Sequence, residues 1–154
     1  LVHGRHPHIS TLHPHEISVV YGPIAHNNST TLFLKSNYKG IVLTLVVAFL
    51  CLYPFQSDKQ STIPHFDKII HVTLFLVLSY FWMHGLSAQN QFKKVQEKAV
   101  LITVVSAIIY GVLIEVLQEV MHLGRSFDIW DIAADGVGVV FASSFHRVIG
   151  RKSP

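Results

Sequence analysis

The chain has 154 residues, of which 50% are hydrophobic and only 14% are charged. Soluble domains carry about 25% charged residues, so this composition excludes an ordinary soluble protein and indicates a surface that contacts lipid. The formal net charge of +3 does not indicate a nucleic-acid partner, because the basic residues are scattered beside apolar runs. The single cysteine, Cys51, excludes an intramolecular disulfide and a cysteine-rich zinc site.

The first 37 residues differ in composition from the rest of the chain. They hold six of the eleven histidines, among Pro, Ser, Thr and Asn, and they show no helical period. The spacings of these histidines match no single defined metal site, so the sequence assigns no metal ligands. We expect residues 1–37 to be a disordered extension or the result of a start site placed too far upstream, and residues 38–154 to form the domain.

Four apolar segments follow in chain order. A bilayer core about 30 Å thick needs roughly 20 helical residues, with roughly 17 to 25 tolerated. A soluble helical bundle would need charged outer faces, whereas residues 100–114 carry no charge on any face. The sequence therefore predicts an all-α integral membrane bundle of four transmembrane helices. The segments cover residues 41–55, 69–86, 99–117 and 129–149.

The basic residues outside these segments predict an orientation. Eight lie on one side of the predicted spans and three on the other, and cytoplasmic loops hold the excess of Lys and Arg. We therefore expect a multi-pass membrane protein with both termini in the cytoplasm. The eight are Lys35, Lys39, Lys93, Lys94, Lys98, Arg147, Arg151 and Lys152, and the three are Lys59, Lys68 and Arg125.

Polar residues gather at the predicted outward ends of the helices. Five of the nine acidic residues fall between positions 115 and 135. Glu115 and Gln118 share one face of the third helix, and Asp128, Asp131 and Asp135 share one face of the fourth, because residues three or four apart lie on one helix face. Gly138 and Ala142 continue the acidic face inward as a seam of small residues, where another helix can approach closely.

The start of the second helix and the loop before the fourth add further charged groups at this end. Asp67 and His71 are one turn apart, and Arg125 is the cation nearest to the acidic face in the sequence. We expect Arg125 to pair with carboxylates through a bidentate fork that lysine cannot copy. The candidate ligand-binding residues are Asp67, Lys68, His71, Glu115, Gln118, Arg125, Asp128, Asp131 and Asp135.

Ordinary structural roles account for several of these residues as well. Glu115 lies near a helix end, where a carboxylate can reach the membrane interface. Asp128 and Asp131 have the spacing of an N-cap followed by an acidic first turn, and His71 could bond a backbone group. Asp135 lies two turns inside its helix, so we expect it to be paired, protonated or next to a wet cavity.

Three strings of residues resemble the VanZ-like family of small bacterial membrane proteins. They are DKIIH at 67–71, EVLQ at 115–118, and GRSFDIWD at 124–131 followed by AADGVG at 133–138. The resemblance covers roughly residues 40–151, and the family usually has Asn where this chain has Asp135. It implies a multi-helix membrane protein whose namesake is associated with low-level resistance to the glycopeptide teicoplanin, and it implies no established reaction or cofactor.

Three classes of function remain open on these grounds. The first is a protein of the cell envelope that recognises a lipid-linked or glycopeptide-type ligand in the outward polar pocket, with the lipid bilayer as its surroundings. The second is an intramembrane enzyme acting on a lipid headgroup, with His71, Glu115 and Asp131 as catalytic candidates, or with His71 and two carboxylates holding a divalent metal. The third is a structural or transport component whose polar residues tie helices together.

Overall fold

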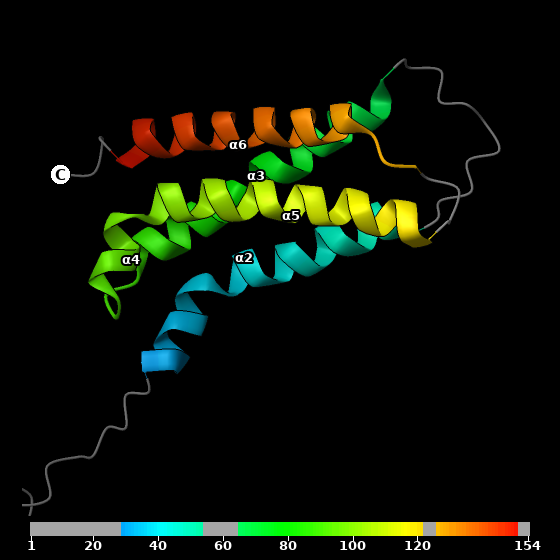
Figure 1. Cartoon of the computed structure of the whole chain (residues 1–154). Coiled ribbons are helices and arrows are strands. Elements are labelled where there is room, and N and C mark those ends of the chain that lie inside the picture. The colour runs from blue at the N-terminus through cyan, green and yellow to red at the C-terminus, as the bar shows by residue number, and fades with distance from the viewer. Residues whose placement is uncertain (1–28, 54–64, 122–125, 151–154) are drawn as a thin grey trace, which may run out of the picture.

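The computed structural model describes residues 29–53, 65–121 and 126–150, which form helices and no strand (Figure 1). The all-α prediction is therefore confirmed for this part of the chain. The helices are α2 (Ser29–Leu52), α3 (Phe66–Ala88), α4 (Lys93–Glu97), α5 (Ala99–Met121) and α6 (Ile129–Gly150).

Four of these helices are long and apolar enough to cross a membrane: α2, α3, α5 and most of α6. Their outward faces carry large apolar side chains that pack against no other part of the described chain. Leu45, Ile109 and Val140, for example, are 68%, 62% and 65% exposed. Contact of such an apolar surface with lipid is favourable, whereas its contact with water is unfavourable. The predicted four-helix membrane bundle is therefore confirmed.

The first spanning helix begins earlier than its apolar segment. α2 starts at Ser29, so residues 29–37 are helical, although we expected them to belong to the extension. Asn37 is 1% exposed and donates from its Nδ2 to the carbonyl of Phe33 at 2.9 Å. It also packs against Gly85 of α3, where an added Cβ would lie 2.6 Å from Asn37 Oδ1. The first part of α2, which the composition does not predict to be helical, therefore packs against α3.

Helix α3 is the centre of the bundle, because it contacts each of the other described helices and packs most extensively against α6. The N-terminal ends of α3 and α6 and the C-terminal ends of α2 and α5 lie together, at the right of Figure 1. The seam between α3 and α6 is close at Gly138. An added Cβ there would meet the Val72 carbonyl and lie 2.9 Å from the Leu76 nitrogen.

Alanine substitutions at two glycines of α6, Gly138 and Gly136, test this close approach. Gly138→Ala should lower the free energy of unfolding by about 1–3 kcal/mol, because the methyl group would push against α3 backbone. Gly136→Ala should be neutral or stabilising by up to about 1 kcal/mol, because an added Cβ at Gly136 meets nothing within 4 Å and alanine favours helix. Thermal unfolding in detergent can be followed through a dye that reacts with the buried thiol of Cys51. Equal effects of the two substitutions would contradict the close seam.

Candidate functional site

A cluster of polar side chains lies where the ends of α3, α5 and α6 meet, at the right of Figure 1. His71, Glu115, Asp131 and Asp135 are each no more than 3% exposed, although they lie in helices that cross the membrane. Buried polar groups at this depth require partners. We call the following residues the polar cluster: Asp67, Lys68, His71, Glu115, Asp128, Asp131 and Asp135.

Lys68 joins the start of α3 to the start of α6. Its Nζ lies 2.6 Å from Asp128 Oδ2 and 2.8 Å from Asp131 Oδ1. Asp128 also caps α6, because its Oδ1 accepts from the Trp130 N–H at 2.8 Å. The hydrogen bond from Lys68, followed by that from Trp130, lowers the pKa of Asp128 below its ordinary value. Capping and ion pairing are therefore roles of the same carboxylate.

His71 and Asp135 form a buried pair one turn deeper. His71 Nδ1 lies 2.9 Å from Asp135 Oδ1, and the two side chains are 1% and 3% exposed. His71 Nε2 has no hydrogen-bond partner in the described structure and lies 3.9 Å from Asp131 Oδ2. The expectation that Asp135 is paired is thus met by His71. Gly111 of α5 makes room for this pair, since an added Cβ would lie 2.6 Å from Asp135 Oδ2.

Two carboxylates of α5 hold the segment that leads into α6. Glu115 Oε2 accepts from the backbone N–H of Asp128 at 2.9 Å, and Glu119 Oε2 accepts from that of Phe127 at 2.8 Å. The sequence analysis did not single out Glu119. Backbone N–H groups at the start of a helix need acceptors. This requirement is the signal that could have indicated Glu119 as an acceptor for the segment before α6. Glu115 Oε1 is buried without a hydrogen-bond partner among the described residues and remains available to a ligand.

The other residues that the sequence predicted for the site are Gln118, Arg125 and Lys68. Gln118 is buried, but its Nε2 donates to the Cys51 carbonyl at 2.9 Å and so fastens α5 to the end of α2. Arg125 lies outside the described residues, and its pairing with the acidic residues stays a prediction. Lys68, which the sequence offered together with His71 as a further match for the acidic residues, forms ion pairs with Asp128 and Asp131.

Three members of the polar cluster have the arrangement of metal ligands. One ligand atom from each of Asp67, His71 and Asp131 can be chosen so that all three lie within 4.8 Å of one another. Imidazole nitrogen and carboxylate oxygen are both ordinary ligands for divalent metals.

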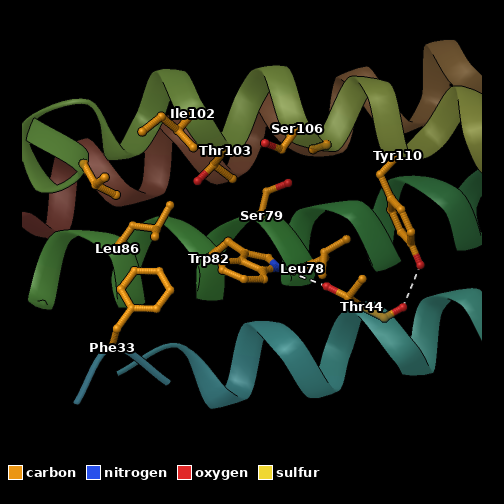
Figure 2. Close-up of a pocket in the computed structure, with 12 residues that line it drawn as sticks. Phe33, Thr44, Leu78, Ser79, Trp82, Leu86, Ile102, Thr103, Ser106 and Tyr110 are labelled. Carbon is orange, nitrogen blue, oxygen red and sulfur yellow. Dashed lines mark hydrogen bonds between the residues drawn. The ribbon is translucent and has the colours of Figure 1, made fainter. Parts of the chain in front are cut away.

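The described residues form two hollows of different kinds. The first is a cavity of about 430 Å³ among α2, α3, α4 and α5, lined by apolar side chains and by several hydroxyl-bearing ones (Figure 2). Thr44 lies at its edge, where it accepts from Trp82 Nε1 at 3.0 Å and its carbonyl accepts from Tyr110 at 2.6 Å. Ser79 points into the cavity and its hydroxyl has no partner in the described structure. Along α3, fully buried Phe75 lies between this cavity and His71.

The second hollow lies on the outside of the α3–α6 seam and has a volume of about 380 Å³. His65, Lys68 and Trp130 line part of it, and the small or apolar side chains of Ala133, Ala134 and Val137 of α6 line the rest. Trp130 is 67% exposed, as is common for tryptophan at a membrane interface. We call this hollow the lateral groove. It has a polar part at Lys68, which bonds two carboxylates of the polar cluster, and an apolar part formed by α6.

The comparison with known protein families gives one match. The model of the family described as VanZ/LLP1 matches residues 20–150, which include every described helix. The chain belongs to the VanZ/LLP1 family. No curated protein and no solved structure matches it significantly. Together with its four spanning helices, VanZ/LLP1 membership identifies a multi-pass membrane protein.

Proposed function

We propose that this VanZ/LLP1 protein binds a lipid-linked molecule, with the polar headgroup at Lys68 and Asp128 and the chain in the lateral groove. The observation that carries the proposal is the groove itself, because one part is lined by Lys68 of the polar cluster and the other part is apolar. A ligand site with this division fits a molecule that has a polar and an apolar part. A soluble glycopeptide would leave the apolar part of the groove without a matching group.

The charges at the groove favour a headgroup that carries hydrogen-bond donors. Lys68 already bonds Asp128 and Asp131, whereas the side chain of Asp128 is 37% exposed and can accept further bonds. Hydroxyl or amine groups would meet this carboxylate favourably. Within this proposal the groove faces outward from the inner membrane, with both termini cytoplasmic. Roles in the cell envelope and in glycopeptide resistance are what the family resemblance adds.

Native mass spectrometry of the gently extracted protein tests this proposal. We expect one class of lipid to be retained at one molecule per chain and to be enriched relative to the total membrane lipid. Ala133→Phe should lower that occupancy at least about fivefold, because it fills the groove from an exposed position. Val105→Phe is the matched control, since Val105 is also exposed and lines none of the described hollows. The proposal would be contradicted if the composition of the retained lipid matched that of the bulk membrane, or if both variants lowered the lipid occupancy equally.

A second function is favoured by the His71–Asp135 pair. Asp135 bonds Nδ1 and leaves Nε2 unpartnered, which is how a carboxylate orients a histidine general base. In this alternative the chain would be an intramembrane enzyme acting on a lipid headgroup. Incubation with membrane lipid and mass-spectrometric search for a product separates the two functions. A product that wild type forms and His71→Gln does not, at equal abundance, would favour the enzyme.

A further inference from the structure

The polar cluster contains a buried imidazole nitrogen for which the helices provide no partner. His71 is 1% exposed, and its Nε2 makes no hydrogen bond in the described part of the chain. An orphaned buried polar atom is costly and therefore uncommon. This atom lies 3.9 Å from Asp131 Oδ2, and Asp67, His71 and Asp131 each offer a ligand atom within 4.8 Å of the other two.

Asp135 prepares His71 for a ligand at Nε2. Its Oδ1 lies 2.9 Å from His71 Nδ1, so that in the neutral imidazole Nδ1 donates to the carboxylate and Nε2 presents its lone pair. A histidine that binds a metal typically donates its other ring N–H to a carboxylate or carbonyl in this way. Gly111 leaves the space that Asp135 needs for this position.

The two aspartates supply the other half of the arrangement. A carboxylate oxygen of Asp67 and one of Asp131 lie within 4.8 Å of each other, and two carboxylates this close repel unless a proton or a cation lies between them. Lys68 bonds Oδ1 of Asp131, which leaves Oδ2 on the side of His71. A doubly charged ion between the two carboxylates would offset this repulsion.

We propose that Asp67, His71 and Asp131 bind one divalent transition-metal ion through His71 Nε2 and one oxygen from each aspartate. A donor set of one imidazole and two carboxylates suits Mn²⁺, Fe²⁺ or Zn²⁺, whereas Ca²⁺ and Mg²⁺ take oxygen ligands. Three protein ligands leave coordination positions open, as in catalytic metal sites. The inference is independent of the proposed lipid ligand, because the ion is tested alone.

Manganese binding to the full chain tests the site. The protein is purified without a polyhistidine tag, and His3, His6, His8, His13, His15 and His26 are replaced by Asn so that they cannot supply imidazole. We expect one bound Mn²⁺ per chain by electron paramagnetic resonance. His71→Ala and Asp131→Asn should each weaken the Kd at least about tenfold. Glu97→Gln, which removes an exposed carboxylate of α4 at the other end of the bundle, should leave the Kd unchanged.

A second readout keeps the inference falsifiable if a variant fails to fold. Pulsed electron paramagnetic resonance of the bound Mn²⁺ should show coupling to an imidazole nitrogen in the parent chain and none in His71→Ala. Folding of each variant is checked by the reaction of Cys51 on heating. Absence of stoichiometric Mn²⁺, absence of nitrogen coupling in the parent, or unchanged binding in a folded His71→Ala would overturn the metal site.

Discussion

Asp135→Leu is expected to lower the free energy of unfolding by about 3 kcal/mol, since it leaves the imidazole of His71 buried without its partner at Nδ1. Asp135→Asn should cost less than about 1 kcal/mol, because the amide oxygen still accepts from Nδ1. The double variant His71→Leu/Asp135→Leu should lie within about 1 kcal/mol of wild type, because it removes both polar groups together.

The measurement for this pair is a double-mutant cycle in detergent, with unfolding followed at Cys51. The chain offers this probe because it has a single cysteine, which is buried. If the two single substitutions to leucine add up in the double variant, the pair is not coupled. Such an outcome would contradict the account of His71 and Asp135 as one unit.

Lys68→Met is expected to lower the free energy of unfolding by about 2 kcal/mol. The loss removes the cation that is hydrogen-bonded to Asp131, whose side chain is only 4% exposed, and a buried carboxylate without its donor is costly. Lys68→Arg should retain most of the stability, because the guanidinium keeps the charge and the donors.

The matched control for Lys68 is Lys94→Met. Lys94 lies on the exposed face of α4, away from the polar cluster, and exposed substitutions usually change stability by less than about 0.5 kcal/mol. Thermal unfolding of the three lysine variants under one detergent condition makes the comparison. A loss in Lys94→Met equal to that in Lys68→Met would show that the effect reflects net charge rather than the contact with Asp131.

Much of the fold could be predicted from the sequence because lipid-facing helices need long apolar segments. Residues 99–117 and 129–149 coincide closely with α5 and α6. The start of α2 could not be predicted, because Ser29 and the residues after it have a polar composition. Their helix packs on α3 instead, and the rings of Phe33 and of Phe92, the residue before α4, meet edge to face with centroids 5.6 Å apart. Such contacts depend on residues that are distant in the sequence.

The candidate site was predictable in membership but not in pairing. The helical spacing of Asp128, Asp131 and Asp135 indicates one face, and these residues do lie together. Which cation or imidazole meets each carboxylate depends on how α3 and α6 rotate against each other, with partners 60 to 64 residues apart. The sequence favoured Arg125, the nearest cation along the chain, and offered Lys68 and His71 as further partners. The described structure shows Lys68 and His71 in contact with the acidic face, and the pairing of Arg125 stays a prediction.

The central claim is that the lateral groove binds the chain of a lipid whose headgroup lies at Lys68. The most direct measurement is photolabelling in native membranes with a phosphatidylethanolamine that carries a diazirine in its acyl chain, followed by mass-spectrometric mapping. The account predicts labels concentrated on Ala133 and Val137 of the groove, which decrease in Ala133→Phe and persist in Val105→Phe. Labels spread evenly over exposed positions such as Leu101 and Ile109, and unchanged by Ala133→Phe, would contradict it.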